Sequence, residues 1–269
     1  MRLNKANASR AQRERGPQPD KSICINVPVG IYFDVIASRV IGLGSPTATV
    51  LRERLSKATR AGRGIRMLRK KQDIIETALR LFEEHGYRAV GIDRIIAESG
   101  VAKMTMYNHF RSKDDLVVAV LHERDQRTRA SLAEFVGRAR RGRPQIRAIF
   151  QWLDQRIKCS GFSGCMFVNA VSEYGNDSGD IARAAAEHKA SMQAYFETVL
   201  MDSVPERANA LARQLMMLVD GAIVSAQVSR RADSADSARE IFSRLLPEPS
   251  PGSGGAVARA TKAETRRAA

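Results

Sequence analysis

The side chains with the clearest chemical potential are close together near residue 100. Lys103, Met104, Tyr107 and Asn108 stand at the start and on the flank of a short predicted helix. Lysine and asparagine donate hydrogen bonds to base edges, and a helix that exposes such residues can enter the major groove of DNA. Lys113 follows in the first turn of the next predicted helix, whose free N–H groups favour a phosphate. This pattern predicts DNA binding.

Two short helices joined by a tight turn must position these side chains. The sequence predicts helices over residues 92–98 and 103–110, separated by Gly100, which tolerates the positive φ that other residues resist. This is the sequence form of a helix-turn-helix. Ser112, with an acid three residues later, predicts the N-cap of a long third element. The residues expected to form the small core are Ile95, Ile96, Val101, Met106 and Phe110.

A longer helix precedes this pair. Apolar residues recur at three- and four-residue intervals from Ile74 to Phe82, and Gly86 follows where a helix is expected to stop. The sequence therefore predicts one helix of about four turns in front of the helix-turn-helix.

The segment from Arg69 to Leu121, and especially the part from Gly86 to Leu116, resembles the amino-terminal DNA-binding domain of the TetR family of bacterial transcription repressors. The matching residues are Ala78, Phe82, Gly86, Tyr87, Ile95, Gly100, Val101, Thr105, Tyr107, His109, Phe110, Ser112 and Lys113. The resemblance implies that Lys103, Met104 and Tyr107 read or touch bases. It also implies that phosphates are held by Thr105, Tyr107, His109 and Lys113. Gly91 and Ala102 depart from the family, which usually has a capping Ser or Thr at both positions.

Simpler interpretations of the same residues stay open. Taken alone, Tyr107 and His109 fit an amphipathic helix with a half-buried aromatic ring and a hydrogen-bonded imidazole, and Lys113 fits a solvated lysine. The run from Arg138 to Arg143 fits a solvated loop or a second DNA site. The basic stretch from Arg60 to Lys71 fits a solvated flank or an arm that reaches an adjacent groove.

The composition favours an all-helical protein. The 269 residues suffice for one large or two smaller domains, and 43% apolar with 27% charged residues is ordinary for a globular chain. Only 6% of residues are aromatic, and 19 Gly with 9 Pro are too few for the many turns of an all-β sandwich. The net charge of +15 is concentrated in residues 1–66. The DNA prediction therefore depends on the motif and not on the overall charge.

The cysteines and the apolar segments favour a cytoplasmic protein, and the family resemblance implies a bacterial one that is associated with the nucleoid when bound to DNA. Cys24, Cys159 and Cys165 are too few and too scattered for a secreted disulfide framework, and no Cys/His cluster has zinc-ligand spacing. We therefore expect no metal and no cofactor. The longest apolar stretch, residues 23–44, is interrupted by charged side chains and is followed by no cleavage site. It predicts neither a membrane span nor a signal peptide.

The chain divides into four parts in this interpretation. Residues 1–66 form an extension that is disordered or that precedes a true start at Met67. Residues 67–121 form the TetR-type helix-turn-helix domain, and residues 122–246 form a helical regulatory and dimerisation domain. Residues 247–269, rich in Pro, Gly, Ser and Ala, form a disordered tail. The predicted fold class is all-α, a three-helix DNA-binding domain followed by a helical ligand-binding and dimerisation domain.

Two apolar stripes near the carboxyl end predict a homodimer. Small and apolar residues recur at heptad-like spacing in the last two predicted helices, as in a four-helix interface. A stripe buried within its own subunit is the alternative. The residues assigned to the interface are Leu211, Leu215, Leu218, Ala222, Ala226, Ala238, Ile241, Phe242 and Leu245.

The helical domain also offers candidates for a site that binds a small-molecule effector. Aromatic and soft side chains with a few polar anchors are typical of such pockets, although each residue also fits a plain core. The candidates are Trp152, Phe162, Cys165, Phe167, Asn169, Glu173, His188, Met192, Tyr195 and Gln214.

These features, together with the resemblance to the TetR family, predict a homodimeric repressor that a small-molecule ligand releases from a palindromic operator, and not an enzyme. One alternative is a helical enzyme with Cys165 as nucleophile and His188 as base, or a thiol redox switch at Cys165. Another is an architectural protein that binds DNA without regulating it. A discrete recognition helix followed by a large helical body argues against the architectural alternative.

Overall fold

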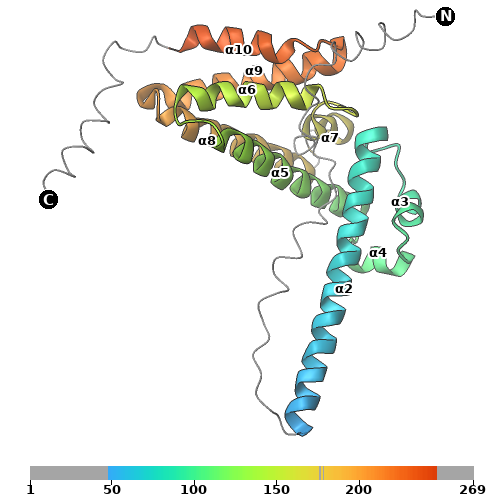
Figure 1. Ribbon diagram of the computed structural model, residues 1–269. Helices are drawn as coiled ribbons and strands as arrows, with labels where there is room; N and C mark the ends of the chain where they lie inside the picture. The colour runs from blue at the N-terminus through green and yellow to red at the C-terminus, as the bar shows by residue number, and fades with distance from the viewer. Residues whose placement is uncertain (1–47, 176, 178, 247–269) are drawn as a thin grey trace, which may run out of the picture.

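The computed structural model describes residues 48–175, 177 and 179–246, with side chains from residue 67 onward. Every regular element in these residues is a helix, which confirms the predicted all-α class. The chain packs as a small amino-terminal group of helices against a larger helical body (Figure 1). The predicted tail at 247–269 lies outside the described residues.

The first helix, α2 (Ala48–His85), begins much earlier than the sequence predicted. We expected residues 1–66 to be disordered or to precede a true start at Met67, but residues 48–66 continue the helix without a break. This segment lacks an apolar period, yet it consists mainly of Ala, Arg, Leu and Lys, which are strong helix formers and outweigh Gly62 and Gly64. The amino-terminal part of α2 extends away from the other helices (Figure 1). Residues 1–47 lie outside the described part of the chain.

Helices α3 (Ile92–Ser99) and α4 (Lys103–His109) pack against α2 and complete the helix-turn-helix. Their bounds agree with the prediction to within one residue. Gly100 has φ of 66°, the left-handed conformation expected at this turn. The predicted core is confirmed, with four side chains buried and Ile96 packed against them. The four are Ile95, Val101, Met106 and Phe110.

The long helix α5 (Lys113–Gly137) begins at the predicted cap. The Ser112 hydroxyl accepts a hydrogen bond from the Asp115 N–H at 3.0 Å, and the Asp115 carboxylate accepts one from the Arg111 N–H at 3.1 Å. These two bonds satisfy backbone donors that the helix itself leaves unpaired. In contrast, neither Gly91 nor Ala102 caps its helix through a side chain.

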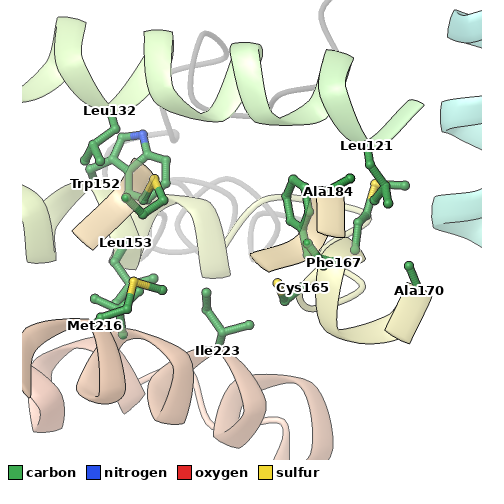
Figure 2. Close-up of a cluster of buried hydrophobic side chains, with 14 of the residues drawn as sticks. Leu121, Leu132, Trp152, Leu153, Cys165, Phe167, Ala170, Ala184, Met216 and Ile223 are labelled. Carbon is green, nitrogen blue, oxygen red and sulfur yellow. The ribbon is translucent and has the colours of Figure 1, made fainter. Parts of the chain in front are cut away.

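The rest of the body packs around α8, which contacts α5, α7 and α9, while α10 covers α9 and α6. Its elements are α6 (Arg143–Ile157), α7 (Met166–Tyr174), α8 (Asp180–Met201), the short 3-10 turn Pro205–Arg207, α9 (Ala208–Ser229) and α10 (Ser234–Leu245). Trp152, Phe167, Phe196 and Phe242 are the large rings of the core. Figure 2 shows how Trp152 and Phe167 lie in one apolar cluster below α5.

The Ser112 cap gives a direct test of how α5 begins. We expect Ser112→Ala to lower the free energy of unfolding by about 1 kcal/mol, because the Asp115 N–H loses its acceptor. Urea denaturation followed by circular dichroism measures the change. Ser237→Ala, an exposed serine within α10, is the matched control and should behave as the wild type. Equal stability of the two variants would show that the cap contributes nothing.

Candidate nucleic-acid interface

Helix α4 exposes the residues that the sequence assigned to base contacts. Met104 is 72% exposed and Tyr107 is 44% exposed, whereas Met106 between them is fully buried. Lys103 and Asn108 are also exposed, and helical spacing places all four on one side of α4. Lys103 lies 3.5 Å from the carboxylate of Asp93, and both side chains are solvated. An exposed side of this composition can contact base edges and thymine methyl groups.

The predicted phosphate-contacting residues lie beside this surface and are less exposed. Thr105, His109 and Lys113 are half-buried. Burial, with a smaller contribution from Lys71, lowers the pKa of His109, so the imidazole is neutral near pH 7. Lys113 Nζ donates to the Arg88 carbonyl at 3.4 Å, and burial lowers the pKa of this lysine. Lys113 therefore lies where the DNA-binding helices meet the body.

A carboxylate that the sequence assigned to the ligand site instead fastens the two parts of the chain together. Glu173 on α7 accepts hydrogen bonds from the backbone N–H groups of Tyr87 at 3.0 Å and Arg88 at 2.7 Å. Arg88 Nε donates to the Glu173 carbonyl at 2.5 Å, and the Tyr87 hydroxyl donates to the Met166 carbonyl at 3.1 Å. Gly86 has φ of +82°, and a Cβ there would lie 3.1 Å from the Glu173 carboxylate. Sequence reasoning missed this junction because its partners are far apart along the chain.

The remaining ligand candidates divide into two groups. Trp152, Cys165, Phe167, His188 and Met192 are buried in the body, and Phe162, Asn169 and Tyr195 are half-buried. The His188 ring stacks on Phe167 at 3.7 Å between centroids, and its Nδ1 lies 2.7 Å from an Asp125 carboxylate oxygen. Asn169 donates to the Ser163 carbonyl at 3.3 Å. Gln214 is exposed on α9, so the structure separates it from the buried group.

The structure does not assemble Cys165 and His188 as a nucleophile and its base. The His188 imidazole is paired with Asp125, and the group that lies beside the buried Cys165 sulfur is Lys189 Nζ, 3.8 Å away. A nucleophile and its base must lie within hydrogen-bond reach of each other. Among the described residues, no cluster of His, Cys, Asp and Glu has the form of a metal site.

The predicted dimer stripe lies largely inside the subunit, which corrects the sequence interpretation. Six of its residues are buried within their own chain, Leu218 and Leu245 are partly buried, and Ile241 is 50% exposed. Helix α9 is apolar on more than one side, so the pattern alone did not distinguish its inner face from its outer face. The six buried residues are Leu211, Leu215, Ala222, Ala226, Ala238 and Phe242.

A different side of α9 carries exposed apolar residues. Met217 is 74% exposed, Val224 is 43% exposed and Val228 is 75% exposed, with the exposed Gly221 between them. These four residues, which we call the outer stripe, recur at intervals of four, three and four residues and so share one side of the helix.

None of the described helices is long and apolar enough to cross a membrane.

Comparison with known proteins agrees with this arrangement. The family described as "Bacterial regulatory proteins, tetR family" matches residues 74–120, and "Transcriptional regulator LmrA/YxaF-like, C-terminal domain" matches residues 144–240. The solved structure of SCO4454, a TetR-family transcriptional regulator from Streptomyces coelicolor, is 31% identical with a TM-score of 0.62. That match covers 66% of this chain and 96% of SCO4454. The chain belongs to the TetR family of transcriptional regulators.

Curated TetR relatives match shorter parts of the chain. The regulator LmrA of Bacillus subtilis is 29% identical over 91 residues, which is 34% of this chain and 48% of LmrA. The regulator AcuR of Cereibacter sphaeroides is 25% identical over 182 residues, which is 64% of this chain and 83% of AcuR. The chain thus spans about half the length of LmrA and most of AcuR.

The buried His188 gives the protein a defined pH dependence. Burial lowers the pKa of His188 to about 4 against the partial opposition of Asp125, whereas an unfolded histidine titrates near about 6.5. The unfolded chain therefore binds a proton that the folded chain does not, and stability falls as the pH drops from about 6.5 towards 4. We expect His188→Asn, which cannot titrate, to lose less free energy of unfolding over this range than the wild type.

Urea denaturation at several pH values measures this difference. His122→Asn, at an exposed histidine of α5, is the matched control and should keep the wild-type pH dependence. The same pH dependence in His188→Asn as in the wild type would show that His188 is not held neutral in the folded protein.

Proposed function

We propose that this TetR-family protein is a homodimeric repressor of the bacterial cytoplasm that a small-molecule ligand releases from a palindromic operator. The observation that carries the proposal is the exposed side of α4, where Met104 and Tyr107 lie in solvent between Lys103 and Asn108. A short helix that exposes such residues on one side, and packs its other side into a buried core, can insert into the major groove.

The roles of the individual residues follow from their exposure. Lys103, Met104, Tyr107 and Asn108 contact base edges, because they are the exposed residues of α4. Lys113 and the half-buried Thr105 and His109 contact the phosphates that flank the groove. Lys113 also donates to the Arg88 carbonyl, and Arg88 is hydrogen-bonded to Glu173 of the body. A phosphate contact at Lys113 therefore depends on how the DNA-binding helices are positioned on the body.

We propose that the outer stripe of α9, with Ile241 of α10, contacts a second copy of the chain. These residues are apolar and exposed in one chain, and the family to which the chain belongs typically forms dimers. A two-fold dimer brings two α4 helices to successive major grooves of a palindromic operator. The DNA-binding part then comprises residues 67–121 with the preceding turns of α2, and residues 122–246 form the regulatory and dimerisation part.

The decisive experiment for this function is footprinting of the purified protein on the DNA upstream of its own gene. A protected palindrome whose half-sites are about one helical turn apart is the expected result. Protection that is independent of sequence would contradict the proposal and favour an architectural protein.

Substitutions on the DNA-facing side should separate base contacts from phosphate contacts. We expect Tyr107→Ala to weaken operator binding while the dimer stays folded, because the exposed ring is not part of the core. We expect Lys113→Ala to weaken binding and to reduce the slope of log K against log salt by about one unit, because one phosphate is no longer neutralised. Fluorescence anisotropy over a salt series measures both. Lys158→Ala, at an exposed lysine of the body, should keep the wild-type slope, and an unchanged slope in Lys113→Ala would remove this residue from the interface.

A charged substitution in the outer stripe tests whether this surface forms the dimer interface. We expect Val224→Glu to dissociate the dimer, because a carboxylate would be buried without a partner in the interface. Sedimentation velocity measures the oligomeric state, and Ala133→Glu, at an exposed position of α5, is the control that should stay dimeric. A Val224→Glu protein that sediments as the wild type would place the interface elsewhere.

A further inference from the structure

Two arginines are buried where the DNA-binding helices meet the body. Arg124 on α5 is 4% exposed and Arg156 on α6 is 7% exposed. Arg124 Nη2 donates to Glu83 Oε1 on α2 at 3.0 Å, and Arg156 Nη1 lies 3.5 Å from the Thr128 hydroxyl. Within the described residues, Arg156 Nε, Arg124 Nε and Nη1, and Glu83 Oε2 have no hydrogen-bond partner. Buried arginines usually have their donors satisfied, so these atoms need an explanation.

The charges of this group do not balance. Of the ionisable side chains that act on Arg156, Arg124 repels it, and Cys165 and Glu83 attract it. Burial and the repulsion from Arg124 lower the pKa of Arg156 to about 10, so it is still charged at neutral pH. Two guanidinium groups therefore share one carboxylate. Two other acids of α5 are already paired, Asp125 with Arg129 and His188, and Glu123 with Arg127.

Aromatic groups lie close to Arg156. The Arg156 guanidinium lies 5.6 Å from the centre of the Trp152 ring, and the neutral His188 stacks on Phe167. Figure 2 shows Trp152 and Phe167 in the buried cluster of the body. An unpaired positive charge in such a setting is strongly unfavourable for the protein alone, and it attracts an anion that carries an apolar body.

We propose that Arg124 and Arg156 bind the carboxylate of an apolar monocarboxylic acid, and that this carboxylate displaces Glu83 from Arg124. A guanidinium binds a carboxylate through two parallel N–H donors on one edge, and on Arg124 that edge pairs the unpartnered Nε with Nη2, which now donates to Glu83. Arg156 offers its unpartnered Nε. The inference rests on the proposed function, because it names the chemical class of the effector.

Displacement of Glu83 would carry the binding event to the DNA-binding helices. Glu83 lies in the last turn of α2, close in sequence to Tyr87, whose backbone N–H is held by Glu173. A helix whose last turn has lost its buried ion pair can change its position on α5, and with it the position of α4. The coupling is reciprocal, so the operator must weaken acid binding by the same factor as the acid weakens operator binding.

The first test needs no ligand. If Arg156 is retained to bind an anion, Arg156→Met should raise the thermal midpoint of the full chain, by about 2 to 4 °C, because an unpaired buried charge is replaced by an apolar side chain of similar length. Arg124→Met should lower the midpoint, since it leaves Glu83 buried without a partner. The matched control is Arg127→Met, which should also lower it, because Arg127 is paired with both Glu76 and Glu123. A decrease in Arg156→Met as large as in Arg127→Met would show that Arg156 has a structural role and would overturn the proposal.

The second test uses defined probes. Calorimetry would titrate 3-phenylpropanoate and the aliphatic acids from butanoate to decanoate into the full chain, with the matching amides and inorganic phosphate as comparisons. We expect at least one acid to bind at least about tenfold more tightly than its amide and than phosphate, and Arg156→Met to lose at least about tenfold of that affinity. Glu83→Gln should bind the same acid more tightly, because the competing carboxylate is gone. Absence of binding by every acid, equal binding of acid and amide, or binding unchanged in Arg156→Met would each overturn the proposal.

The two proposals fail in different ways. A protein that binds acids through Arg156 but protects no palindrome keeps the anion site and contradicts the repressor function. A protein that protects its operator, binds an acid through Arg156 and is not released by that acid contradicts the displacement of Glu83.

Discussion

The carboxylate of Glu173 holds the backbone at Tyr87 and Arg88 and so fixes the DNA-binding helices on the body. Just after the end of α2, two backbone N–H groups that would otherwise have no partner in the protein donate to this one charged acceptor. Such charge-assisted bonds are stronger and more directional than neutral ones. Because α3 and α4 follow this point directly in the chain, the orientation of the recognition helix depends on it. The close approach of Glu173 to Gly86 adds a steric limit to the same junction.

The contacts between α2 and α5 include two ion pairs beside the buried apolar residues of both helices. Glu83 pairs with Arg124, and Arg127 pairs with Glu76 on α2 and Glu123 on its own helix. Ion pairs of this kind add little net stability over apolar packing of similar volume, but they specify which groups meet. A competing carboxylate can therefore replace one partner without opening the apolar cores on either side. This property links the buried arginines of the body to the position of α4.

Local patterns predicted the DNA-binding part well. The turn at Gly100, the Ser112 cap and the bounds of α3 and α4 follow from short-range backbone chemistry, and the side chains of α4 follow from its period. The sequence pattern did not indicate the early start of α2, because residues 48–66 are helical through the propensity of their residue types and have no apolar face that a periodicity could reveal. The sequence pattern placed the dimer stripe largely on residues of α9 that are buried in their own chain, because the helix is apolar on two sides. Glu173 looked like a ligand anchor since its partners lie far away in sequence, and the pairing of Arg124 with Glu83 was missed for the same reason.

Hydrogen exchange of the segment from Gly86 to Val90 measures the central junction most directly. In Glu173→Gln the acceptor loses its charge, and the amide hydrogens of Tyr87 and Arg88 should exchange many times faster than in the wild type. Segments within α9 should exchange at the wild-type rate, because they do not touch this carboxylate. Unchanged exchange at Tyr87 and Arg88 would show that Glu173 does not hold the DNA-binding helices on the body, and that the position of α4 depends on other groups.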